Sequence, residues 1–135
     1  MHSTLSIRKT TKRKAPPSAF FLRAKESILG TSYELSLVLC GPALSHTYNK
    51  KFRGKDKPTN ILSFPLTKKS GEILLDLTTA KKDAAAFDMD EQTFFGFLFI
   101  HGLIHLKGYE HGSTMEKLEK KYFKLFFPRK KLPYV

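Results

Sequence analysis

The chain has 135 residues, which suits one domain (residues 1–135), and its hydrophobic content of 41% excludes a disordered polymer. Lysine and arginine outnumber the acids 24 to 12, so the net charge of +12 indicates either a polyanionic partner, nucleic acid before an anionic membrane surface, or a basic soluble surface with no specific partner. The single cysteine excludes an intrachain disulfide, and no apolar run reaches membrane-spanning length, so we expect a cytoplasmic protein without a membrane partner.

Apolar periodicity predicts an alternation of strands and helices along the chain. In chain order the patterns indicate a strand over 4–9, a helix from Ser18 that Gly30 ends, a strand over 33–39, a helix over roughly 43–51, a polar loop over 52–59, a strand over 60–64 that Pro65 ends, a strand over 72–77, and helices over 80–87, 90–107 and 113–126. The helix over 90–107 is apolar nearly all round, so we expect it to be the buried central helix. Asp88 and Glu91 have the spacing of a capping box at its start.

Five basic residues lie in the seven-residue stretch 8–14, and they are either a solvated loop or an arm that contacts phosphates.

Three of the five histidines lie in the stretch HGLIHLKGYEHG, which begins at His101. His101 and His105 are four residues apart on a helix, so their imidazoles share one face. Gly108 can adopt the left-handed conformation that ends a helix and turns the chain, which brings His111 back to the same point. Three imidazoles and an open fourth position form a catalytic zinc site, with nitrogen–metal distances of about 2.0–2.1 Å, whereas three core histidines explain this spacing poorly. We therefore predict one metal ion per chain, zinc by default, although imidazole also suits nickel, copper and iron.

The same spacing matches the zinc-protease motif HExxHxxGxxH at every position except 102. Gly102 stands where those proteases carry the glutamate that acts as general base, so the sequence predicts a metal site without peptidase chemistry. Glu110, next to His111, is the candidate for a general base or for a carboxylate that orients a ligand. Glu72 and Asp76 are weaker candidates for the same role.

A second motif, NKKFRGKDKPTNILSFP, occupies residues 49–65. Together with HGLIHLKGYEH, in which Glu110 replaces the usual aspartate, and with the short stretch GEI at 71–73, it resembles the YbeY family of bacterial rRNA-maturation endoribonucleases. The resemblance extends from about Tyr33 to Phe127.

The resemblance implies an α+β fold, with a small mixed sheet of about four strands, about five helices, and a buried central helix that carries zinc-binding His101, His105 and His111. It implies a single-strand-specific, metal-dependent endoribonuclease that matures ribosomal RNA, including the 3′ end of the 16S species, and helps in ribosome quality control. Arg53 is implied to be essential in a groove near the metal. The expected partners are ribosomal RNA and the ribosome or its small-subunit proteins, and no dinucleotide cofactor is expected.

The residues themselves assign Arg53 a chemical role, because a guanidinium can neutralise charge that develops on a phosphate and can bind it bidentately. Four lysines around it would hold the RNA backbone without reading bases, unless they simply solvate a loop: Lys50, Lys51, Lys55 and Lys57. Two other functions stay open at this stage, an rRNA- or ribosome-binding assembly factor with a structural zinc and a metal-dependent hydrolase of another substrate. The attacking group, water or the 2′-hydroxyl of the substrate, is also open.

Overall fold

The computed structural model describes residues 4–133, and it shows the expected α+β architecture with a single mixed sheet. The strand order is β1-β2-β4-β3. Strands β1, β2 and β4 are parallel, and β3 runs antiparallel to β4 at one edge. The strands are β1 (Leu5–Lys9), β2 (Glu34–Cys40), β3 (Ile61–Thr67) and β4 (Ser70–Asp76). The helices are α1 (Ser18–Leu29), α2 (Pro42–Arg53), α3 (Leu77–Ala86), α4 (Glu91–Leu106) and α5 (Ser113–Phe126).

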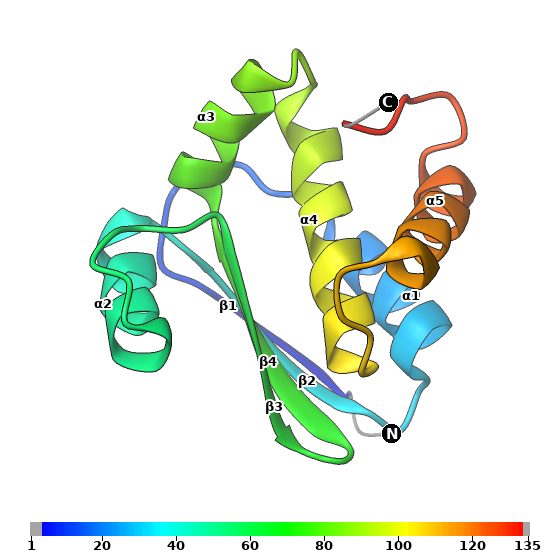
Figure 1. The fold of residues 1–135 in the computed structure, drawn as a ribbon, viewed down its shortest axis with the longest axis horizontal. Helices are drawn as coiled ribbons and strands as arrows, with labels where there is room; N and C mark the ends of the chain where they lie inside the picture. The colour runs from blue at the N-terminus through cyan, green and yellow to red at the C-terminus, as the bar shows by residue number, and fades with distance from the viewer. Residues whose placement is uncertain (1–3, 134–135) are drawn as a thin grey trace.

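Helices cover both faces of the sheet, and the main core lies on the face that α4 packs against (Figure 1). Successive side chains of a strand point to opposite faces, so Leu35, Leu37 and Leu39 of β2 enter this core. Val38 and Cys40 of the same strand instead join a smaller cluster under α2. No helix of the described residues is long and apolar enough to cross a membrane.

Helix α4 is buried along almost its whole length, as its uniformly apolar sequence predicts. Its N-cap is Asp90, whose carboxylate accepts hydrogen bonds from the backbone and the hydroxyl of Thr93, at 3.0 and 2.8 Å. The expected capping role of Asp88 is therefore wrong. Asp88 lies in the preceding turn with a φ of 52°, whereas Asp90 directly precedes the first helical residue.

Other expected boundaries are also wrong: β4 begins at Ser70 instead of 72, and α3 begins at Leu77 instead of 80. Pro65 does not end β3, because β3 is an edge strand, where a residue without a backbone N–H is tolerated. Helix α2 runs further than expected and includes Arg53, which we had expected in a polar loop. Gly54 ends this helix with a φ of +67°, and the buried Asn49 donates to the Lys57 carbonyl at 2.9 Å, which ties the following loop back to α2.

Gly102 allows α4 to lie directly against the edge strand β3. A Cβ atom at this position would lie 2.8 Å from Ser63 Oγ and 2.9 Å from Ile61 Cδ1. Ser63 Oγ also donates to the Gly102 carbonyl at 3.3 Å. The position that carries a glutamate in zinc proteases is therefore a packing contact here.

We expect Gly102→Glu to lower the free energy of unfolding by roughly 1–3 kcal/mol from overpacking alone. Denaturant unfolding measures this loss. Gly102→Ala is the graded comparison, since a gain in helix propensity of about 1 kcal/mol offsets part of its smaller clash. A Gly102→Glu protein as stable as the wild type would show that the contact is not tight.

Candidate metal centre

Three histidine side chains converge at the C-terminal end of α4. His101 and His105 lie on this helix, and His111 lies in the loop that leads to α5. The candidate ligand atoms of the three residues are all within 4.8 Å of one another, and the Nε2 atoms of His101 and His105 are 3.0 Å apart. The three imidazoles can therefore hold one metal ion between them, as the spacing in the sequence predicts.

Gly108 makes the turn that brings the third histidine back. Its φ of +108° is in the region that favours glycine, and its backbone N–H donates to the His105 carbonyl at 2.9 Å. The N–H of Tyr109 then donates to the Ile104 carbonyl at 3.3 Å. These bonds end α4 and turn the chain back, so that His111 lies beside the last turn of α4.

Hydrogen bonds to the outer ring nitrogens orient two of the imidazoles. His105 Nδ1 donates to the Tyr109 carbonyl at 3.0 Å, and His101 Nδ1 donates to a carboxylate oxygen of Glu119 at 3.2 Å. A proton on each Nδ1 leaves the lone pair of each Nε2 facing the other across 3.0 Å. Two lone pairs at that distance repel unless a cation lies between them, so the donor set fits a metal ion.

The electrostatic environment also favours the neutral form of His105. Burial, with the neighbouring His101 as the next cause, lowers the pKa of His105 below its usual value. A neutral imidazole is the form that binds a metal.

Glu119 is a functional candidate that our reading of the sequence missed. It belongs to α5 and is 4% exposed, whereas its neighbours Glu116 and Lys120 are exposed. The signal was present in the helical spacing, because Met115, Glu119 and Phe123 are four residues apart and form one buried stripe. An acid in an apolar stripe requires a polar partner in the interior, and here that partner is His101.

We expect Glu119→Gln to weaken zinc binding about 10- to 100-fold, because the amide keeps the shape but not the charge that raises the basicity of His101. Competition with a chromophoric chelator measures the affinity. The matched control is Glu26→Gln, an exposed glutamate of α1, a helix that carries none of the three histidines. Unchanged zinc affinity in Glu119→Gln would refute this orienting role.

A groove with a volume of about 840 Å³ runs past the three histidines. Its wall includes residues 61–65 of β3, and Arg53, Phe52 and Glu110 also line it. Arg53 is exposed and makes no ion pair with any residue that the structure describes. A free guanidinium therefore shares one cavity with the candidate metal ligands, although Arg53 and His101 are 48 positions apart in the sequence.

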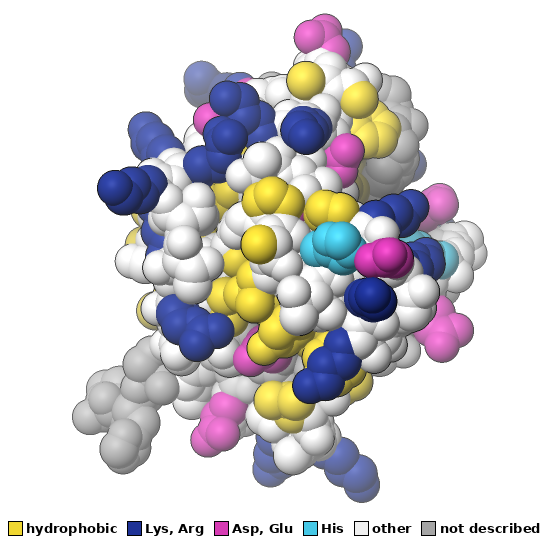
Figure 2. Space-filling model, turned by 90° about the vertical axis from the view of Figure 1, so that its left-hand side faces the viewer, with side chains coloured by type: hydrophobic (Ala, Val, Ile, Leu, Met, Phe, Trp, Pro, Cys, Tyr) yellow, Lys and Arg dark blue, Asp and Glu magenta, His cyan; other side chains and the backbone are white. Residues whose placement is uncertain are grey.

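The four candidate lysines lie around the C-terminal end of α2 but outside the groove lining. Lys50 is 3.9 Å from Asp56, which also pairs with His46 at 2.6 Å, and Lys51 Nζ lies 5.2 Å from the centroid of the Phe52 ring. Lys55 and Lys57 are exposed in the loop that follows. Figure 2 shows Lys and Arg side chains around the face that α2 occupies, with hydrophobic side chains between them.

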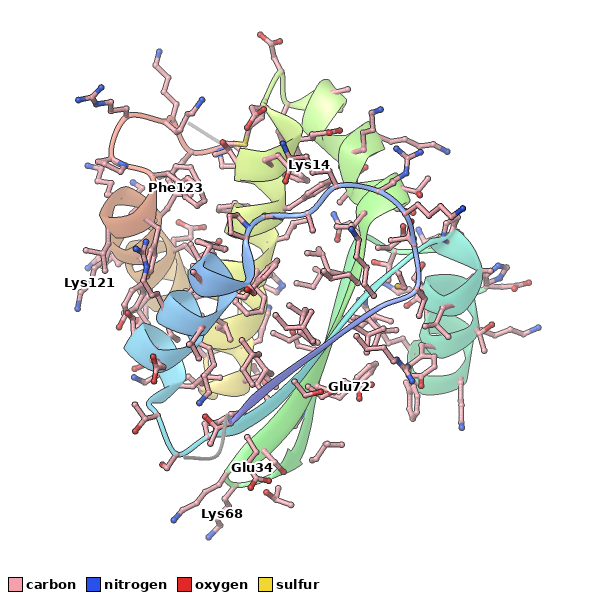
Figure 3. All side chains as sticks on the ribbon, turned by 180° about the vertical axis from the view of Figure 1, so that it is seen from behind. Lys14, Glu34, Lys68, Glu72, Lys121 and Phe123 are labelled. Atoms are coloured by element: carbon pink, nitrogen blue, oxygen red, sulfur yellow. The ribbon has the colours of Figure 1, made fainter. Side chains whose placement is uncertain are left out.

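The two weaker candidate bases lie away from the histidines. Glu72 is on the side of the sheet opposite α4 (Figure 3), as its neighbour Leu74 in the smaller cluster also indicates. Asp76 is fully buried, caps α3 and accepts a hydrogen bond from Ser45 Oγ at 2.7 Å. Asp76 therefore fastens α2 and α3 to the end of β4.

Comparisons with known proteins show the family of the chain. The family model described as Endoribonuclease YbeY matches residues 3–126. The chain belongs to the endoribonuclease YbeY family. A YbeY endoribonuclease of Neorickettsia sennetsu is 35% identical over 120 residues, which cover 82% of this chain and 84% of that protein. One of Nautilia profundicola is 37% identical over 95 residues, covering 67% and 68%.

The YbeY fold is also seen in a solved structure. The solution structure of a Thermotoga maritima protein superposes with a TM-score of 0.66 and 25% sequence identity, over 89% of this chain and 87% of that one. The expected family and fold class are thus confirmed.

Proposed function

We propose that this YbeY-family protein is a zinc-dependent, single-strand-specific endoribonuclease that acts in the cytoplasm on ribosomal RNA, in its maturation and in ribosome quality control. One observation carries the proposal: three converging imidazoles and an unpaired arginine line a single groove. An anionic phosphodiester is the substrate that such a pair of features suits.

The chain's own residues divide the work at the scissile phosphate. His101, His105 and His111 would hold the metal ion, which would supply Lewis-acid chemistry at a phosphoryl oxygen. Arg53 holds the phosphate and neutralises the charge that develops on it in the transition state. Glu110, which lines the same groove, accepts the proton of the attacking group, water or the 2′-hydroxyl of the substrate, as the P–O bond to the leaving oxygen breaks.

An exposed aromatic side chain supports the preference for single strands. Phe52 is 54% exposed on the groove wall, and its ring centroid lies 5.0 Å from that of Phe64. Bases that are not paired can stack on such rings, whereas the bases of a duplex are already stacked.

RNA affinity is expected to fall steeply with salt, because phosphate contacts release counterions. Five contacts, from the four lysines near α2 and from Arg53, correspond to a slope of about −3.5 in a plot of log affinity against log salt for a single strand. Fluorescence anisotropy over a salt series measures this slope. Lys55→Ala should reduce its magnitude by about 0.7.

The control for that series is Lys121→Ala, since Lys121 points away from the body of the protein on the outer side of α5 (Figure 3). A flat affinity between low and moderate salt would contradict the role of the net charge.

A second candidate function is supported by the net charge of +12 alone, namely an rRNA- or ribosome-binding assembly factor in which zinc only stabilises the fold. Cleavage of a defined single-stranded RNA by the purified protein, beside a His105→Ala variant, separates the two. RNA binding without cleavage in both proteins would favour the assembly factor, and zinc-dependent cleavage of a different ester substrate would favour another hydrolase.

A further inference from the structure

A second cavity, which Arg53 does not line, adjoins the metal centre. It has a volume of about 380 Å³ and is lined by residues of α4 and α5 and by Phe87 in the turn after α3. His101 and His111 line both this cavity and the groove, as do Asn60 and Ile61. A molecule that reaches the metal through the groove therefore has a second, contiguous space next to the reacting atoms.

Aromatic rings form one wall of this cavity and lead to a metal ligand. The centroids of Phe87 and Phe94 are 5.7 Å apart with an interplanar angle of 32°, and those of Phe94 and Phe97 are 6.1 Å apart at 23°. The series continues from Phe97 to His101 at 6.4 Å. Phe94 and Phe97 are buried and held in place, whereas Phe87 is 50% exposed at the outer end of the series.

The turn that carries Phe87 is well fixed. The backbone N–H of Phe87 donates to the Asp83 carbonyl at 3.2 Å, and the N–H of Met89 donates to the Ala84 carbonyl at 2.9 Å. A ring held on such a backbone loses little conformational entropy when a flat ligand stacks on it.

The charges of the lining distinguish this cavity from the groove. Among the described residues that line it there is no lysine or arginine, and two are acids, Glu116 and Glu119. The cavity therefore does not suit a phosphate. Asn60, also in the lining, donates through Nδ2 to the Asp83 carboxylate at 2.8 Å, which leaves its side-chain oxygen as an acceptor.

We propose that this cavity binds the nucleobase of a nucleotide that flanks the scissile phosphate. This inference rests on the proposed endoribonuclease function. The base stacks on Phe87, and an exocyclic amino group of adenine, cytosine or guanine donates to Asn60 Oδ1. The phosphate stays in the groove with Arg53, so the metal centre lies between the base site and the phosphate site.

The test is a set of single-stranded RNAs of one sequence, each with an abasic nucleotide at one position, cleaved in single turnover by the zinc-loaded protein. With the wild type, an abasic nucleotide next to the cleaved bond should raise the half-saturating protein concentration on the order of 10- to 100-fold. Phe87→Ala should show the same rise on intact RNA and little further rise on the RNA that is abasic at that position. Phe87→Trp should retain tight binding.

The matched control is Leu125→Ala, since Leu125 is 61% exposed on α5 and lines neither cavity. Melting temperatures of all variants check the fold. If the rises in half-saturating concentration caused by Phe87→Ala and by the abasic nucleotide multiply when both are combined, the two changes act independently and the base site is overturned. The base site is also overturned if Phe87→Ala cleaves intact RNA with the same half-saturating concentration as the wild type. Both results leave the endoribonuclease proposal intact, whereas absence of cleavage by the wild type overturns both proposals.

Discussion

Replacing His105 with alanine is expected to remove the bound metal and to abolish RNA cleavage. The variant keeps only two of the three imidazoles. Its loss in metal affinity should exceed the factor of about 10 to 100 that removal of a ligand's hydrogen-bond partner typically causes. Elemental analysis of the purified protein measures the metal content, and a defined single-stranded RNA measures the cleavage.

Thermal unfolding gives an independent measure of the same site. A ligand that binds only the folded state stabilises it by about 2.7 kcal/mol at 100 times its dissociation constant, so zinc should raise the melting temperature of the wild type but not of His105→Ala. The matched control is His46→Ala. His46 lies on α2, pairs with Asp56 in the following loop, and lines neither cavity at the metal centre. Full metal content in His105→Ala would mean that the three histidines are not the site.

Arg53→Ala is expected to lower the cleavage rate by roughly 10²–10³, which corresponds to about 2.7–4 kcal/mol of lost transition-state stabilisation. The melting temperature and the metal content should hold, because Arg53 is exposed and pairs with no acid in the described part of the chain. Asp56, the acid nearest to Arg53 in the sequence, pairs with His46 and Lys50, so Arg53→Ala breaks no ion pair with it. Single-turnover cleavage, compared with RNA affinity, separates a loss of rate from a loss of binding.

Arg53→Lys sharpens this experiment, since lysine keeps the charge but cannot bind a phosphate bidentately. It should recover only part of the rate. Arg23→Ala on α1 is the control for loss of a positive charge outside both cavities. Wild-type cleavage by a folded, metal-loaded Arg53→Ala protein would leave catalysis to the metal centre alone.

The three candidate metal ligands and most elements were predictable because their signals are local. A spacing of four residues places two side chains on one helical face in any fold, and Gly108 supplies a backbone conformation that other residues rarely adopt. The alternation in β2 and the apolar run in α4 likewise reflect burial, which a short window of sequence records.

Element boundaries depended on contacts that no local pattern contains. The end of α2 at Arg53 goes with a tether from the buried Asn49 to the loop beyond it, and Pro65 stays within β3 only because β3 is at the edge of the sheet. The N-cap of α4 is Asp90 rather than Asp88. The backbone N–H groups of Asp88 and Met89 donate to carbonyls at the end of α3, so Asp88 belongs to the turn that precedes α4.

Residue patterns alone were therefore enough to predict the family, the fold class and the three candidate metal ligands. The surroundings of these ligands depend on how the helices and the sheet pack together. Packing of α5 against α4 brings the carboxylate of Glu119 to His101, and the position of α2 beside β3 places Arg53 in the same groove. These groups come from segments far apart in the chain, and burial of apolar surface between helices and sheet, rather than any spacing of residues, sets the distances between them.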